Sequence, residues 1–356
     1  MEIGSILQTA SYDKYLPSQN SDSFKLPFMQ DDEWLSSFFQ SGRNAIEVLF
    51  AETAPGASVL VPDFVCGTVP EAIQRAGCRV VNYHIDDDFT FSFEEINALL
   101  SETKILYIVH FFGRKFSETE MKAISHWKNE GITVVEDITM SLYSKDPEAF
   151  GFGDYIIGSI RKWLPVSDGG FILSKAKSFD APKMQSVSLY SYYYQLAQML
   201  KKQYIEAGEK DAKLKETYMN FYHESIRYLF SDYSIAPISP VSMNYILNTQ
   251  SQNSYFKRVQ NYTYLSEGLK DFGDSIRPAV ILNPGYVPFG MVVKCTKRDE
   301  LLQYLIKNDI YCNIHWRLDL PAVFSLSNQI LTIPCDERYG KKEMDRILQV
   351  IKDFYR

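Results

Sequence analysis

Short apolar segments alternate with amphipathic segments along the first half of the chain. The apolar segments are rich in Val and Ile, which is typical of strands that are buried on both faces of a parallel sheet. The predicted strands span residues 59–63, 79–85, 104–112, 133–138, 155–160 and 170–173. The predicted helices between them span residues 44–52, 69–76, 93–100 and 118–130. This alternation predicts an α/β fold, with a mostly parallel sheet and helices on both of its faces.

The pattern changes after the last of these strands. A Tyr-rich segment, residues 191–230, predicts two or three helices, and core packing or a subunit contact is favoured there over a platform for stacking bases. Two prolines within residues 234–242 predict a boundary. Beyond it we expect a long helix over 242–272, strands near 287–295 and 311–315, and a closing helix. We therefore expect a large domain over residues 1–240 and a smaller α+β domain over 241–356.

Composition excludes some classes of protein. Apolar residues make up 46% of the 356 residues, and the formal charge of −7 argues against non-specific binding to nucleic acid. No apolar run reaches the roughly 18 residues of a membrane span, and the first residues lack the pattern of a signal peptide. The five cysteines and five histidines are scattered without disulfide or metal spacing, so we expect no metal site. A reducing cytoplasm fits these features.

One lysine stands out because it lies between two apolar strands. Lys162 follows the strand 155–160, and a Gly169-Gly170 pair precedes the strand 170–173. A buried lysine is costly to desolvate, and paired glycines suggest that backbone approaches something closely there. Asp137 ends the neighbouring strand 133–138. Ligands of open α/β sheets bind beyond the carboxyl ends of the strands, so these residues are candidates for a site.

A candidate anion site precedes the first predicted helix. Residues 41–45 read SGRNA, and the free N–H groups of a helix start can hold a phosphate. Pyridoxal phosphate (PLP) needs an amine for its Schiff base, an acid beside its ring nitrogen and a site for its phosphate. Lys162, Asp137 and residues 41–45 supply these three groups. Each feature is common by itself, and their order along the chain is what indicates this cofactor.

These segments resemble the DegT/DnrJ/EryC1/StrS family of fold-type I PLP-dependent aminotransferases. The resemblance covers most of the chain and suggests a divergent branch whose lysine motif reads SxRKxxPxxDGG. It implies a fold-type I PLP-dependent transferase, with a large α/β domain and a smaller C-terminal α+β domain. The motifs that carry it are SGRNAIEVLF, VLVPDFVCGTVPEAIQRAGCRVVNYHID, KILYIVHFFG, VVEDITMS, GSIRKWLPVSDGGFILSK and IPCDERYGKKEMDRI.

The resemblance implies roles for individual residues. Lys162 matches the lysine that carries PLP covalently, and Asp137 matches the partner of the ring nitrogen. Gly42, Arg43 and Asn44 match the turn that binds the cofactor's phosphate, where the family usually has a Thr or similar small residue in place of Arg43. Arg43 either adds charge at the phosphate or forms an ion pair on the helix face, and the sequence leaves both open.

Other positions match the family less well. Ser159 resembles a serine that contacts the phosphate, although it lies closer to the lysine here. Cys66 stands where the family places an aromatic residue over the cofactor ring, so either Cys66 or Phe64 covers the ring, or Cys66 is a plain buried cysteine. Met140 replaces a Gln or His that would donate a hydrogen bond to the cofactor.

Three further residues are weaker candidates. His110 near the end of strand 104–112 is more typical of a paired strand-end residue than of a base. His315 and Arg317 lie in NIHWRLDLP, where related enzymes turn a loop toward the substrate. Arg317 either holds a substrate anion or forms a surface salt bridge, and the latter is slightly favoured.

The resemblance also implies a reaction. An amino acid donor, Glu or Gln in many relatives, would load the cofactor, and the amine would pass to a keto acceptor. The expected acceptor is a nucleotide-linked keto-sugar for surface polysaccharide biosynthesis, and the expected assembly is a homodimer with shared active sites. One alternative is transamination or decarboxylation of a small phosphorylated ketone or amino acid. A catalytically idle scaffold is another, although the retention of Asp137 and Lys162 argues against it. The sequence does not identify donor, acceptor, stereochemistry or pathway.

Overall fold

A computed structural model describes most of the chain: residues 2–17, 24–29, 33–145, 150–182, 188–231, 233–249, 254–316 and 324–356. Its largest sheet has seven strands in the order β2-β8-β7-β6-β5-β3-β4. The pairs from β7 through β4 are parallel, whereas β8 runs antiparallel to both of its neighbours. The predicted α/β fold with a mostly parallel sheet is therefore confirmed. The strands are β2 (Leu35–Phe39), β3 (Ser58–Pro62), β4 (Arg79–Tyr83), β5 (Ile105–Val109), β6 (Thr133–Asp137), β7 (Tyr155–Ser159) and β8 (Gly170–Ser174).

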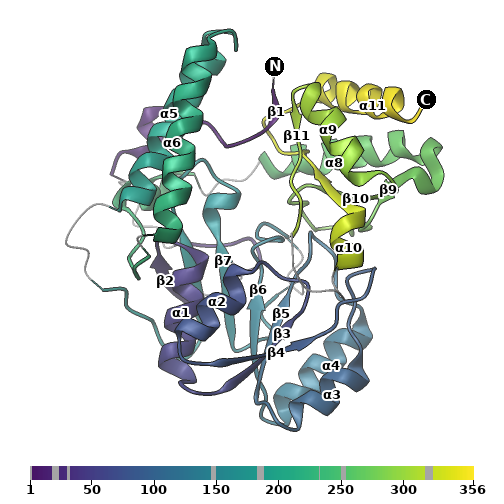
Figure 1. Cartoon of the computed structure of the whole chain (residues 1–356). Coiled ribbons are helices and arrows are strands. Elements are labelled where there is room, and N and C mark those ends of the chain that lie inside the picture. Colours follow the sequence, from purple (N-terminus) through teal and green to yellow (C-terminus); the bar gives the residue numbers. More distant parts are fainter. Residues whose placement is uncertain are drawn as a thin grey trace.

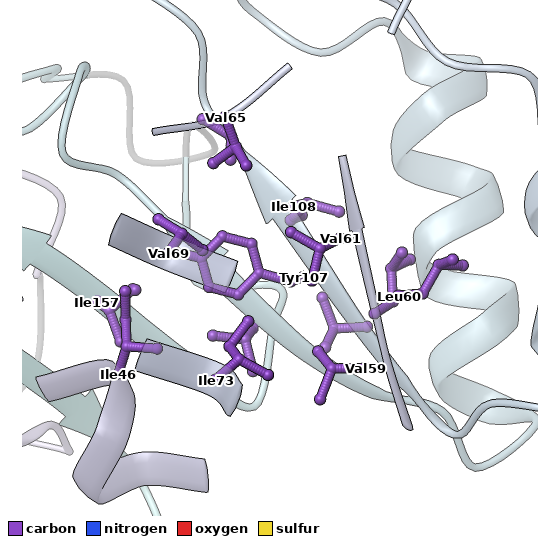
Figure 2. Packing of buried hydrophobic residues seen from close by; sticks show 14 of the residues in the cluster. Ile46, Val59, Leu60, Val61, Val65, Val69, Ile73, Tyr107, Ile108 and Ile157 are labelled. Carbon is purple, nitrogen blue, oxygen red and sulfur yellow. The ribbon is translucent and has the colours of Figure 1, made fainter. Parts of the chain in front are cut away.

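Helices cover this sheet as the apolar periodicity predicted (Figure 1). They are α1 (Gly42–Thr53), α2 (Thr68–Arg75), α3 (Phe93–Leu100) and α4 (Glu118–Asn129). Figure 2 shows how α1 and α2 bring Ile46, Val69 and Ile73 toward Tyr107 of β5. Tyr107 and its neighbours on β5 are all buried, which is why this strand is almost purely apolar in sequence.

The edge strand β2 was missed in the sequence, because its pattern LSSFF is short and only partly alternating. It pairs antiparallel with β8, from Leu35 opposite Ser174 to Phe39 opposite Gly170. This pairing brings Gln40 and Ser41, which follow β2 directly, beside the Gly-Gly pair.

The Tyr-rich segment forms a helical hairpin of two helices, α5 (Leu189–Glu206) and α6 (Ala212–Ser231). Its aromatic rings pack within the hairpin, as in the parallel stack of Tyr193 on Tyr228 with 5.4 Å between ring centroids. Figure 1 shows the hairpin rising from the sheet on one side, with the C-terminal elements on the other.

The long helix expected over residues 242–272 is wrong. The structure has two separate helices there, α7 (Pro240–Asn248) and α8 (Ser254–Leu269), and residues 250–253 lie outside the described part. A 3₁₀-helix, η3 (Lys270–Ser275), follows α8, and Gly273 with φ of 51° interrupts it. The segment between α7 and α8 is polar (NTQSQNS) and offers no apolar face for a continuous helix to bury.

The C-terminal part is built on a second, antiparallel sheet in the order β12-β10-β9. The expected strand near 311–315 is shorter than predicted: β11 pairs in parallel with β1 near the start of the chain. The N-terminal residues therefore pack on the C-terminal part, and the domain boundary at residue 240 stays a prediction. None of the described helices is both long and apolar enough to cross a membrane. The remaining elements are β1 (Ile3–Gly4), η1 (Tyr12–Tyr15), β9 (Ile276–Pro278), β10 (Met291–Cys295), α9 (Arg298–Lys307), β11 (Ile310–Tyr311), α10 (Phe324–Gln329), β12 (Ile330–Ile333) and α11 (Lys341–Tyr355).

Candidate active site

Lys162 ends a short 3₁₀-helix, η2 (Ile160–Lys162), that follows β7 directly. Its neighbours Ile160 and Trp163 are buried in the core, which fixes the turn. Lys162 lines a cavity of about 250 Å³. Burial lowers the pKa of Lys162 and the charge of Arg161 adds to this, while Cys66 and Asp137 act in the opposite direction. The net fall favours the neutral amine, which is the form that attacks a carbonyl.

Asp137 ends β6 and lines the same cavity. One of its oxygen atoms accepts a hydrogen bond from the hydroxyl of Tyr107 at 2.8 Å, and the other accepts from the N–H of Thr139 at 2.9 Å. Burial and the Asp137 charge raise the pKa of Tyr107 well above its ordinary value, so this hydroxyl keeps its proton and remains a donor. The carboxylate is thus held in place beside Lys162, because β6 and β7 are neighbours in the sheet.

The start of α1 forms another wall. Ser41 caps the helix by accepting a hydrogen bond from the N–H of Asn44, and Gly42 and Arg43 line the cavity. The N–H groups at the first two positions of a helix have no partner within the helix and favour an anion. The Asn44 amide instead donates to the carbonyl of Ser234 at 3.0 Å, so its side chain ties α1 to the chain beyond α6.

The Gly-Gly pair explains how β8 and α1 come together. A Cβ atom on Gly170 would lie 2.1 Å from the carbonyl carbon of Ser41 and 2.4 Å from the nitrogen of Gly42. Gly169 has φ of 128° and donates its N–H to the carbonyl of Gln40 at 2.9 Å. The close approach that the paired glycines suggested is therefore the contact with the start of the first helix. Ser159 lines the cavity at this point as well.

Within the described part of the chain, Arg43 has no partner for the helix-face ion pair that was one of its two interpretations. Its guanidinium lies over the ring of Phe230 at 4.8 Å and near that of Tyr233 at 5.2 Å, and it donates to the carbonyl of Leu229 at 3.4 Å. Arg43 is buried but lines the cavity, and its Nε has no hydrogen-bond partner among the described residues.

Cys66 lines the cavity, and Phe64 does not. Phe64 is fully buried and packs against Phe89, Phe111 and Trp316. The Cys66 thiol lies 3.2 Å from the hydroxyl of Thr68. Between the two residues, Cys66 is therefore the one that can contact a ligand.

Met140 lines the cavity and is buried, so an apolar thioether stands where a donor was expected. His110 is a paired core residue, as its position suggested. Its Nε2 lies 3.0 Å from one carboxylate oxygen of Glu136, and the other oxygen of Glu136 accepts hydrogen bonds from the N–H groups of Gly151 and Gly153. His110 and Glu136 are both almost fully buried and line no part of the cavity.

His315 lies close to the site without lining it. Its Nδ1 is 2.8 Å from the hydroxyl of Thr332, and burial together with the charge of Lys162 lowers the pKa of His315 to about 3. Arg317 falls outside the described residues, so its role stays a prediction.

Trp316 lines the cavity, as expected for the loop NIHWRLDLP, and Arg161, which the sequence analysis did not single out, lines it as well. Asp168 of the lysine motif was also not singled out; it accepts hydrogen bonds from Ser191 at 2.7 Å and Ser239 at 3.0 Å. Burial raises the pKa of Asp168, although its serine partners oppose the rise. The Asp-Gly-Gly triplet was a signal for Asp168, because it adjoins the glycines. Arg161 gave no signal of its own beyond its place next to Lys162.

The residues present fit PLP. The cavity combines an amine of lowered pKa, a fixed carboxylate, and a helix start beside an arginine whose Nε is unpartnered among the described residues. A larger cavity of about 650 Å³ lies between α8 and residues 278–287, but it contains none of the predicted site residues. We assign the site to the smaller cavity because the ionisable groups converge there.

Comparison with known proteins bears on the family and the fold. Residues 39–180 match the model of the DegT/DnrJ/EryC1/StrS aminotransferase family, a stretch that runs from the end of β2 past β8 and includes both Asp137 and Lys162. The match agrees with the predicted family over this stretch, and that family is one of aminotransferases. A comparison with curated protein sequences found no match.

Solved structures share the fold at low sequence identity. PseC from Helicobacter pylori, an aminotransferase of pseudoaminic acid biosynthesis, has a TM-score of 0.67 at 12% identity and covers 99% of both chains. DesI, solved with its TDP-sugar product, has a TM-score of 0.64 at 13% identity over 89% of this chain and 79% of its own. NtdA from Bacillus subtilis, solved with pyridoxamine phosphate (PMP), has a TM-score of 0.62 at 16% identity over 89% and 72%. These similarities establish the fold.

Proposed function

We propose that this chain is a PLP-dependent aminotransferase of the DegT/DnrJ/EryC1/StrS family. In this proposal Lys162 carries the cofactor covalently, and the acceptor is a nucleotide-linked keto-sugar. The observation that carries this proposal is the convergence on one cavity of Lys162, Asp137 and the start of α1. Burial lowers the pKa of Lys162, which suits an amine that must react with an aldehyde.

PLP supplies an electron sink for the bond that breaks at the carbon bearing the amino group. The chain's own residues position the reactants and move protons. Lys162 Nζ would accept the proton that this carbon loses as general base and, as general acid, would deliver it to the former aldehyde carbon of the cofactor. Asp137, fixed by Tyr107 and Thr139, holds negative charge at the end of β6 and so favours a protonated ring nitrogen. The N–H groups of Gly42 and Arg43, with Ser159, receive the phosphate.

The substrate part of the proposal draws on the neighbours. DesI was solved with a TDP-sugar product, and PseC acts in the biosynthesis of pseudoaminic acid. A role in surface polysaccharide biosynthesis follows as part of the same proposal. The test is to load the cofactor with amine from glutamate or glutamine and then titrate it with nucleotide-linked keto-sugars and with small phosphorylated ketones. Discharge by the small ketones alone would reject the sugar substrate.

We include a homodimer and a cytoplasmic location in the proposal. Three large apolar side chains of α5 are exposed: Leu189 at 40%, Tyr192 at 49% and Met199 at 46%. Such an exposed apolar surface supports a subunit contact on the hairpin. All five cysteines are free thiols, which suits a reducing compartment. Light scattering coupled to size exclusion measures the oligomeric state.

Replacing the lysine tests the covalent link. We expect Lys162→Ala to lose the visible absorption band of bound PLP while keeping its fold, because Lys162 is the only lysine that lines this cavity among the residues that the structure describes. Absorbance and circular dichroism measure the two properties. Asp137→Asn is the matched control, since it keeps the amine and should keep the band while turnover falls. A Lys162→Ala protein that stays yellow, with cofactor fixed by borohydride, would remove Lys162 from its role.

A further inference from the structure

The cavity at Lys162 carries more positive than negative charge. Among the described residues, its lining includes two permanently charged arginines, Arg43 and Arg161, beside Lys162, and a single carboxylate, Asp137. Asp137 already accepts hydrogen bonds at both of its oxygen atoms. The excess positive charge favours binding of an anion with more than one negative charge. A site with only one lysine and one aspartate would not favour such an anion.

Arg161 is held by aromatic rings and not by an acid. Its guanidinium lies 5.7 Å from the ring centres of Tyr190 and Tyr194, which are both buried in α5. Burial disfavours its charged form, but both tyrosines and Tyr222 favour that form and so raise the pKa of Arg161. Neutral phenols fix the direction of a guanidinium without neutralising it, so its charge stays available to a ligand.

Two other arginines near Lys162 show the contrast. Arg258 and Arg338 line a separate cavity of about 100 Å³ that Lys162 also borders. Arg258 forms an ion pair with Glu337, and Arg338 donates to both oxygen atoms of Asp336, at 2.7 and 2.9 Å. These arginines already have carboxylate partners. Arg43 and Arg161 lack one among the described residues, and both border the cavity that contains the start of α1.

We propose that Arg161, together with Arg43, binds the phosphate group of the cofactor. The inference rests on the proposed function and deepens it, because it assigns the residue that directly precedes the reactive lysine to the phosphate site. A phosphate dianion at the start of α1 receives the N–H groups of Gly42 and Arg43, the Ser159 hydroxyl, and two guanidinium groups that give charge-assisted hydrogen bonds. The hairpin thus contributes to cofactor binding by orienting Arg161 through Tyr190 and Tyr194.

The test compares PLP with pyridoxal, which carries the aldehyde but no phosphate. Dissociation constants come from absorbance titrations of the cofactor-free protein with each compound. We expect Arg161→Gln to weaken PLP binding about tenfold or more and to change pyridoxal binding by less than about twofold. Inorganic phosphate should compete with PLP on the wild-type protein and compete less on the variant.

Arg161→Lys is the matched control, because lysine keeps the charge but loses the two-pronged geometry, so its affinity for PLP should fall between the other two proteins. Circular dichroism checks that each variant folds, and Arg161→Lys keeps the proposal testable if Arg161→Gln does not fold. Equal losses for PLP and pyridoxal, or an unchanged affinity for PLP, would overturn the assignment of Arg161. A wild-type protein that binds neither compound at Lys162 would instead overturn the proposed function itself.

Discussion

At the scale of single residues, the environment of Lys162 also lowers the pKa of its neighbour His315. His315 is buried beside the lysine, and both burial and the lysine's charge lower the pKa of His315 to about 3. The imidazole is therefore neutral over the physiological range, and its contact with Thr332 suits a positioning role more than that of a base. In the unfolded chain, histidine has a pKa of about 6.5. Between this value and the folded pKa, His315 binds a proton in the unfolded state but not in the folded state.

This difference predicts a pH dependence of stability. Because the folded pKa of His315 lies below the unfolded one, the unfolded state binds the extra proton, and the free energy of unfolding falls as the pH drops below about 6.5. The loss attributable to His315 reaches about 2 kcal/mol at pH 5 and levels off near the folded pKa. Denaturant unfolding of the wild type and of His315→Asn between pH 7 and pH 5 measures it. Parallel curves for the two proteins would contradict the prediction, since the other histidines contribute equally to both.

At the scale of elements, the site depends on one contact between β8 and the start of α1. Because β8 runs antiparallel between β2 and β7, its first residue lies against the turn that begins the helix. The backbone atoms of Ser41 and Gly42 leave no room for a side chain on Gly170. This contact fixes the distance between the start of α1, where we propose that the phosphate binds, and the lysine motif.

We therefore expect Gly170→Ala to lower the free energy of unfolding by roughly 3 kcal/mol and to weaken PLP binding, because either β8 or α1 must move. Gly67→Ala is the control. It lies near the same cavity but has open space around it and an ordinary helical φ of −54°, so its stability should change by less than about 0.5 kcal/mol. Denaturant unfolding and PLP titration measure both effects. Equal stability of the two variants would show that β8 adjusts without cost.

At the scale of the whole molecule, the N-terminal segment joins the hairpin to the C-terminal part. Glu2 is buried and forms ion pairs with Lys201 of α5 at 2.9 Å and Lys215 of α6 at 2.5 Å. Two residues later, the N–H of Gly4 donates to the hydroxyl of Tyr339 at 2.7 Å, and β1 pairs with β11. Ser5 and Leu7 then border the smaller cavity beside Lys162.

Removing the charge of Glu2 should leave Lys201 buried without a partner, because the Lys201 side chain is only 3% exposed. We expect Glu2→Gln to lower the free energy of unfolding by about 3 kcal/mol. The double variant Glu2→Gln with Lys201→Met should recover much of this loss, since no unpaired buried charge remains there. Thermal and denaturant unfolding compare the three proteins, and a Glu2→Gln variant as stable as the wild type would show that water reaches Lys201.

Much of the fold and part of the site could be predicted from the sequence, since both follow from local patterns. The periods of apolar residues determined the strands and helices of the sheet, and strand order along the chain placed Asp137 and Lys162 at the ends of β6 and β7. Because parallel strands end at the same edge, these two residues had to be neighbours once β6 and β7 paired. The same reasoning identified the Gly-Gly pair as a close approach of backbone.

Only the tertiary structure decided which side chains complete the site. Arg161 and the end of α6 reach the cavity from positions that no local pattern marks, because their roles depend on contacts between distant parts of the chain. Tertiary packing also gave Cys66 the place at the cavity, buried Phe64 elsewhere and paired His110 with Glu136. The sequence determines which side chains are present. Tertiary packing determines whether a charged side chain contacts an opposite charge, an aromatic ring or an open cavity.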